Sequence, residues 1–166
     1  MSDIEAARDR LKKFIYVTPL ERSSELDERG VLLYSKLETL QRTGSFKIRG
    51  ALNKILSLDE RERKRGVVAA SMGNHAQGVA LAAQLANIPA TVVMPAGAPL
   101  VKLENTRSYG ATVIEEGKTV EESMAVAGRM AAQQGLCLIP PFDDDAVIAG
   151  QGTIGNGAPL PAQPPA

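Results

Sequence analysis

Short apolar runs alternate with longer amphipathic segments through the second half of the chain. Four runs rich in Val, Ile and Ala are bounded by Gly, Pro or polar residues and predict buried strands over 66–71, 89–95, 111–117 and 136–142. The segments between them carry apolar residues three and four positions apart, which predicts helices over 73–87, 100–110 and 120–135. This alternation predicts an α/β fold with a parallel sheet covered by helices on both faces.

The first 65 residues follow a less regular pattern. Apolar residues at helical spacing predict a helix over 3–14, which Thr18-Pro19-Leu20 ends. Alternation over 31–38 predicts a strand, and a second helix is expected over about 45–56. The basic cluster at 61–65 is interrupted by Glu62, which favours a solvated helix end over a binding patch.

The last part of the chain begins as a helix and then changes character. Residues 142–155 have the pattern of a helix start, but four of the eleven residues in 156–166 are proline. Little in that stretch is able to pack, so we predict a disordered Pro/Ala-rich tail.

Composition narrows the class of protein. Hydrophobic residues make up 44% and charged residues 23%, as in globular domains. Lys+Arg and Asp+Glu both number 19, and this zero balance argues against nucleic acid as a partner. No window approaches the roughly 18 apolar residues of a membrane span, and the charged start lacks the apolar core of a signal peptide. We therefore expect a cytoplasmic protein that binds neither nucleic acid nor membrane.

The segment "LQRTGSFKIRGALNKI" (40–55) places Lys47 where a helix begins, at the positive end of the helix dipole. Thr43-Gly44-Ser45-Phe46 supplies a turn, a cap and an apolar neighbour. Burial and a positive helix end both lower the pKa of a lysine, and a neutral amine is a nucleophile for aldehydes. From the local residues alone, a surface lysine in a first turn is the simpler interpretation.

The segment "SMGNHAQG" (71–78) follows a predicted strand and opens a helix. Free backbone N–H groups at such a helix start favour an anion, for example a carboxylate or phosphate. The pattern is not the GxGxxG of dinucleotide sites, because only Gly73 and Gly78 are present. A plain capped turn, with Asn74 in an awkward backbone conformation, remains the alternative.

Other chemistries find little support. His75 is the only histidine, so a three-ligand site of His and Cys is unavailable and no metal is expected. A lone histidine in a turn is more often packed than catalytic. No His/Asp relay accompanies Ser45 or Ser71, and Asp143 to Asp145 suit a helix N-terminus. Cys137, the only cysteine, excludes an internal disulfide and suits a small buried side chain.

Three motifs together resemble a known family. "KLETLQRTGSFKIRGA" (36–51), "SMGNHAQGVA" (71–80) and "PFDDDAVIAGQGTIG" (141–155) are similar to the threonine dehydratase (threonine ammonia-lyase) and serine racemase family, with "TPL" (18–20) also fitting. That family belongs to the tryptophan-synthase-β-like, fold type II pyridoxal-phosphate enzymes. The resemblance covers residues 4–155.

The resemblance implies roles for individual residues and pyridoxal 5′-phosphate as cofactor. Lys47 is expected to hold the cofactor through its amine and later to move the substrate's Cα proton. Phe46 is expected to pack on the pyridine ring, and Asn74 to bond the ring hydroxyl. The remaining implied roles belong to the loop that receives the substrate carboxylate: Ser71, Gly73, Asn74 and His75.

The implied reaction is β-elimination of L-threonine or L-serine to 2-oxobutyrate or pyruvate plus ammonia, in a homo-oligomer, with isoleucine biosynthesis as one setting. Serine racemases of the family carry a serine directly before the Gly-Asn pair. Met72 stands there in this sequence and cannot shuttle a proton, so dehydration is expected rather than racemisation.

The family's chains are about twice as long. The resemblance therefore divides this one into an incomplete N-terminal part of the large cofactor-binding domain (1–65) and a three-layer α/β/α small domain (66–150). In the family, the second half of the chain supplies a glycine-rich phosphate loop, a group facing the pyridine nitrogen and a cation site. This sequence has no counterpart of that half, so impaired activity is expected. We also expect Leu32, Tyr34 and Ile48 to lack much of their cover.

An inactive fragment that acts as a binding or oligomer-partner module is the alternative function. A dinucleotide-binding unit ranks last, because Met94-Pro95 stands where that fold needs an acidic residue.

Overall fold

A four-stranded parallel sheet forms the centre of the computed structural model, which describes residues 2–24, 29 and 31–156. Its strands lie in the order β5-β4-β3-β6, with β3 Val67–Ala70, β4 Ala90–Met94, β5 Thr112–Glu115 and β6 Cys137–Leu138. All four predicted strands are confirmed. The last is short because Pro140 and Pro141 follow it, and proline has no N–H to donate to a ladder.

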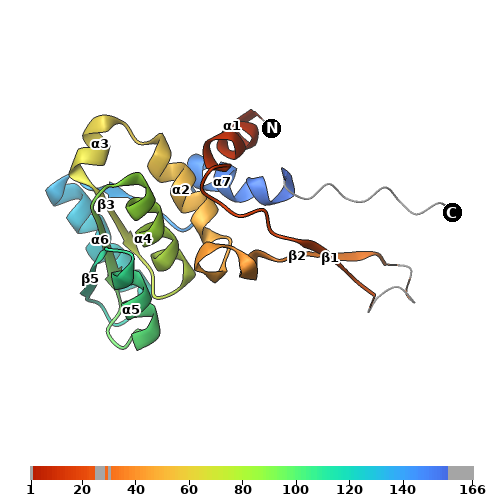
Figure 1. Ribbon diagram of the computed structural model, residues 1–166. Coiled ribbons are helices and arrows are strands. Elements are labelled where there is room, and N and C mark those ends of the chain that lie inside the picture. Colours follow the sequence, from red (N-terminus) through yellow and green to blue (C-terminus); the bar gives the residue numbers. More distant parts are fainter. Residues whose placement is uncertain (1, 25–28, 30, 157–166) are drawn as a thin grey trace.

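Helices cover both faces of this sheet (Figure 1). Val67, Ala69 and Val92 belong to the larger core, which includes Val79 of α4 (Asn74–Ala86). The alternate side chains of the same strands, such as Val68 and Val93, pack with Val126 and Ala127 of α6 (Val120–Gln134). The helix α5 (Leu100–Ser108) packs beside α4. The predicted α/β/α layering is therefore confirmed.

The described part of residues 2–65 forms helices and a two-stranded antiparallel ribbon that projects away from them (Figure 1). Strand β1 (Leu20–Ser23) pairs antiparallel with β2 (Leu33–Lys36), so the strand expected over 31–38 is shorter and has a partner that the pattern missed. Two short 3₁₀ turns follow, η2 (Glu38–Leu40) and η3 (Arg42–Gly44). The helices of this part are α1 (Ser2–Leu11), α2 (Lys47–Ser57) and α3 (Glu60–Arg65).

The helix α7 (Asp145–Asn156) packs against α1 and α2. The contact between α7 and α2 is close because Gly150 of α7 faces Gly50 of α2. A Cβ built at Gly150 would lie 2.6 Å from the Arg49 carbonyl oxygen and 2.7 Å from the Gly50 Cα. The predicted disordered tail lies outside the described residues apart from Asn156, which is helical.

The expectation that Ile48 lacks cover is wrong. Ile48 is 0% exposed, since α4 and α7 both pack on α2. Leu32 is 45% exposed as expected, and Tyr34 is half-buried. Among the described residues, no helix has the length and apolarity needed to cross a membrane.

Candidate active site

The candidate site lies where the strand order of the sheet reverses. After β3 the chain continues through α4 to β4 on one side, while β6 pairs with the other side of β3. In open α/β sheets, ligands bind outside the carboxyl ends of the strands at such a switch point. The two segments that leave the sheet here are residues 71–73 after β3 and residues 139–141 after β6.

Lys47 reaches one of these segments from α2. It is the first residue of the helix and is half-buried, and its Nζ donates a hydrogen bond to the Pro141 carbonyl oxygen at 3.0 Å. The same Nζ lies 5.3 Å from the centroid of the Phe46 ring, which is 38% exposed. Lys47 does lie in the first turn of the helix, but its amine is held at the switch point by the Pro141 carbonyl.

The turn before Lys47 is built differently from the expected serine cap. Phe46 is the N-cap residue of α2 and no side chain caps the helix. Thr43 and Gly44 both have positive φ, 65° and 67°. The Ser45 hydroxyl is buried and has no hydrogen-bond partner among the described residues.

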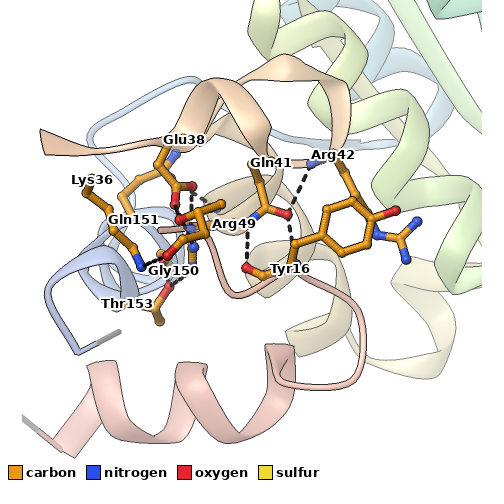
Figure 2. Close-up of polar contacts among 11 residues, drawn as sticks. Tyr16, Lys36, Glu38, Gln41, Arg42, Arg49, Gly150, Gln151 and Thr153 are labelled. Carbon is orange, nitrogen blue, oxygen red and sulfur yellow. Dashed lines mark hydrogen bonds and ion pairs between the residues drawn. The ribbon is translucent and has the colours of Figure 1, made fainter. Parts of the chain in front are cut away.

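A glutamine anchors this turn to the segment after α1. The amide of Gln41 accepts from the Tyr16 N–H and donates to the Tyr16 carbonyl, both at 2.9 Å (Figure 2). Its oxygen also accepts from the Arg42 N–H, and the Arg42 guanidinium lies 4.5 Å from the centre of the Tyr16 ring. Sequence reasoning missed Gln41, because nothing in a single polar residue before a turn reveals a partner 25 positions away.

The N-terminus of α4 is open to a ligand. Gly73 is its N-cap and no side chain caps it, so the first N–H groups of a 13-residue helix lack intrahelical partners. A Cβ built at Gly73 would meet nothing within 4 Å. The Ser71 hydroxyl accepts from the Gly73 N–H at 3.2 Å. Asn74 lies in the helix and has no positive φ, which argues against the plain capped turn.

His75 is a packed residue. It is 4% exposed, and its Nε2 lies 3.0 Å from the Ile139 carbonyl oxygen, so Nε2 carries the proton. Burial lowers its pKa to about 4, against the effect of the Ile139 carbonyl, and the nearby charge of Lys47 acts in the same direction as burial. The other ring nitrogen, Nδ1, is buried and has no hydrogen-bond partner among the described residues.

A buried ion pair fixes α2 between its neighbours. Arg49 donates to both carboxylate oxygens of Glu38, from Nε at 2.7 Å and from Nη2 at 2.8 Å (Figure 2). Thr18 donates to the same carboxylate, and Arg49 also reaches Thr153 of α7 at 3.2 Å. Burial alone would raise the pKa of Glu38, but the Arg49 and Thr18 hydrogen bonds outweigh it and the pKa is lowered. Sequence reasoning missed this network.

The structure thus brings together the sequence-predicted residues from two separate motifs: Phe46 and Lys47 before and at the start of α2, and Ser71, Gly73, Asn74 and His75 around the start of α4. The site thus combines an amine at the switch point of a parallel sheet with an uncapped helix N-terminus, on two helices, α2 and α4, that pack against each other. Among the described residues, no group of three His, Cys, Asp or Glu side chains is arranged to hold a metal ion.

The family is shown by comparison with known proteins. The model of the "Pyridoxal-phosphate dependent enzyme" family matches residues 11–157, and the chain belongs to this family. It is 56% identical over 156 residues to the L-threonine ammonia-lyase of Thermotoga maritima, covering 93% of this chain and 39% of that one. An L-threo-3-hydroxyaspartate ammonia-lyase of a Pseudomonas species is 50% identical, with 91% and 48% covered. A catabolic L-threonine dehydratase of Staphylococcus aureus is 47% identical, with 93% and 45% covered.

Solved structures agree with this assignment. The serine racemase of Dictyostelium discoideum superposes with a TM-score of 0.86 at 44% identity, covering 94% of this chain and 51% of that chain. Threonine deaminase isoform 2 of Solanum lycopersicum gives 0.87 at 44% identity, covering 94% and 43%. The chain therefore spans about two fifths to one half of the proteins it matches.

Proposed function

We propose that this chain carries the lysine-bearing part of a pyridoxal-phosphate-dependent ammonia-lyase. The substrates would be β-hydroxy amino acids, L-threonine or L-serine, and the products 2-oxobutyrate or pyruvate plus ammonia. The observation that carries the proposal is the placement of the Lys47 amine at the switch point, on a helix that packs against α4, whose N-terminus is open.

The residues present fit the lysine-linked and ring-binding parts of such a cofactor. Lys47 offers a primary amine, and half-exposed Phe46 offers an aromatic face next to it. Asn74 is exposed, and although its amide oxygen accepts from Lys102, its N–H₂ group is left to donate. The Ser45 hydroxyl, two residues before Lys47, is a further buried polar group without a partner among the described residues. The phosphate is different, because the resemblance places its glycine-rich loop in the second half of the family's chains, whereas Gly150, Gly152 and Gly155 lie inside the helix α7.

Each residue has a defined task in this proposal. Pyridoxal phosphate, when bound, supplies an electron sink for negative charge at the substrate Cα. The backbone N–H groups at the start of α4 bind the substrate carboxylate, with Ser71 holding the Gly73 loop in shape. Lys47, which donates to the Pro141 carbonyl here, would hold the cofactor through its amine. Once the substrate amine had displaced it from the cofactor, the Lys47 amine would be placed to take the Cα proton.

Met72 favours elimination over racemisation in this proposal. It lies at the position where the resemblance implies a serine in racemases, and it is 40% exposed. A thioether carries no transferable proton. The proposal therefore assigns proton transfer at Cα to Lys47 alone, even though a serine racemase is among the structural matches.

A 2-oxo acid assay tests the proposal. The 166-residue chain is incubated with pyridoxal phosphate and either L-threonine or L-serine, with Lys47→Ala as the matched control. Formation of 2-oxobutyrate or pyruvate that disappears in Lys47→Ala supports it. No product and no lysine-linked cofactor absorbance, from a chain folded by circular dichroism, would contradict it.

A second candidate is a binding or oligomer-partner module without activity of its own. Exposed apolar residues around the hairpin favour it: Val17 is 92% exposed, Leu40 57% and Tyr16 50%. Contiguous exposed apolar surface marks interaction sites. A homo-oligomer, a cytoplasmic location and a place in isoleucine biosynthesis stay predictions, and the catabolic name of the Staphylococcus relative points away from the last.

A further inference from the structure

Two polar contacts join α5 to the start of α4 in parallel. Lys102 Nζ donates to Asn74 Oδ1 at 3.3 Å, and Asn105 Nδ2 donates to Gln77 Oε1 at 3.5 Å. The donors are three residues apart on α5 and the acceptors three apart on α4, so each pair lies one helical turn from the other. We call these two contacts the amide ladder.

The first contact determines how the Asn74 amide is turned. A lysine ammonium has three donors and no acceptor, so only the carbonyl end of the amide can face Lys102. The N–H₂ end is then free to donate elsewhere. An ionised ring hydroxyl is an acceptor and requires this donor. If the Asn74 amide were turned the other way, its oxygen would face the oxygen of the ring hydroxyl.

The second contact leaves a donor in need of a partner. Gln77 is 4% exposed, and its Nε2 has no hydrogen-bond partner among the described residues. Buried polar groups are almost always satisfied. With its oxygen held by Asn105, this N–H₂ group therefore points to an acceptor from outside the described part of the chain, such as a ligand oxygen or a water held by it.

We propose that Lys102 is a positioning residue for the cofactor and acts through Asn74. The contact of Asn105 with Gln77 is the second contact of the same amide ladder. This inference rests on the proposed function. Lys102 itself touches no reacting atom; it holds Asn74 with the amide donor toward the ring hydroxyl. Neither Lys102 nor Asn105 belongs to the motifs that carry the family resemblance.

The test compares Lys102→Met, which removes the donor, with Lys102→Arg, which keeps one. Lys13→Met is the control, because Lys13 is an exposed lysine just after the end of α1. Pyridoxal phosphate is titrated and followed by difference absorbance against Lys47→Ala. Lys102→Met should raise the apparent Kd about threefold to tenfold, the effect of one hydrogen bond. Lys102→Arg should stay within about twofold.

The absorbance spectrum gives a readout that a purely structural role would not change. Without the Lys102 ammonium, the Asn74 N–H₂ group is no longer held toward the ring hydroxyl. The ionisation of that hydroxyl, and hence the ratio of the two absorbance bands, should therefore change in Lys102→Met and not in Lys102→Arg. Equal affinity and an unchanged band ratio in all variants would overturn the inference while leaving the proposed function standing. If the unsubstituted chain forms no Lys47-dependent band, both are contradicted.

A measurement without cofactor tests the amide ladder itself. The side-chain amide signals of Asn74, assigned with Asn74→Asp, are recorded by two-dimensional ¹H–¹⁵N NMR. They should shift in Lys102→Met and remain in place in Lys13→Met. Unmoved signals in Lys102→Met would show that Lys102 does not hold Asn74, which would overturn the inference whatever the cofactor titration gives.

Discussion

Gly78 of α4 lies directly against the backbone of Lys47 in α2. A Cβ built at Gly78 would be 3.1 Å from the Lys47 carbonyl carbon and 3.2 Å from the Ile48 nitrogen. The absence of a side chain at residue 78 thus lets the helix that carries Asn74 and His75 approach the start of the helix that carries Lys47. The two motifs of the site are joined by this contact.

Gly78→Ala should separate these helices. The added methyl group meets backbone atoms, which cannot rotate away, and overpacking of this kind costs about 1–3 kcal/mol of unfolding free energy. Denaturant unfolding measures the loss. Gly128→Ala in α6 is the control, since a Cβ there meets nothing within 4 Å and alanine favours helix by up to about 1 kcal/mol. Equal stability of the two variants would show that the contact is loose.

Loss of Arg49 should be strongly destabilising. Arg49→Met leaves the Glu38 carboxylate buried without its cation, which typically costs about 3–5 kcal/mol. Combining it with Glu38→Gln removes the uncompensated charge and should restore part of that loss, as a double-mutant cycle would measure. A double variant no more stable than Arg49→Met would contradict this account of the ion pair.

The same pair predicts acid sensitivity. Because the pKa of Glu38 is lowered in the folded protein, its stabilisation is present above its ordinary value of 4.5 and is lost as the pH falls through the lowered pKa. Unfolding measured from about pH 5 downward should show this loss, and it should be weaker in the double variant. A parallel decline in both proteins would assign the acid sensitivity to other carboxylates.

His75 predicts a second pH dependence in a higher window. Its pKa is about 4 in the folded protein, against an ordinary value of 6.5, so the unfolded chain takes up the proton first as the pH falls. The contribution of the neutral His75 ring to the free energy of unfolding is therefore fully present above pH 6.5. It declines by roughly 3 kcal/mol as the pH falls to 4. His75→Gln retains a donor for Ile139 and has no such slope. Identical pH profiles for the two proteins would refute the buried neutral histidine.

The sheet and its helices were predictable because each has a local signal. The runs before Ser71, Pro95 and Gly117 are apolar and bounded by turn residues, and alternation of strand and helix allows few topologies. The β1 strand "LERS" has no such signal, since it is a half-exposed ribbon strand with no apolar alternation. The burial of Ile48 was missed because α7, whose glycines bring it close, was expected only as a helix start.

The site was predictable where a motif places residues next to one another. Phe46 and Lys47, or Gly73 to His75, follow from a helix start and a resemblance. Contacts across the fold were not predictable from the sequence, and three pairs illustrate this: Lys47 with Pro141, Arg49 with Glu38, and Lys102 with Asn74. Such pairs depend on the packing of helices far apart in the chain, and a single sequence carries no record of which polar residues meet.

Covalent trapping at Lys47 tests the central claim most directly. The folded chain is mixed with pyridoxal phosphate, reduced with borohydride, digested, and mapped by mass spectrometry. The account predicts one dominant reduced adduct on the peptide that contains Lys47, absent from Lys47→Ala. Adducts spread evenly over exposed lysines such as Lys13 and Lys118, or none at residue 47, would contradict it.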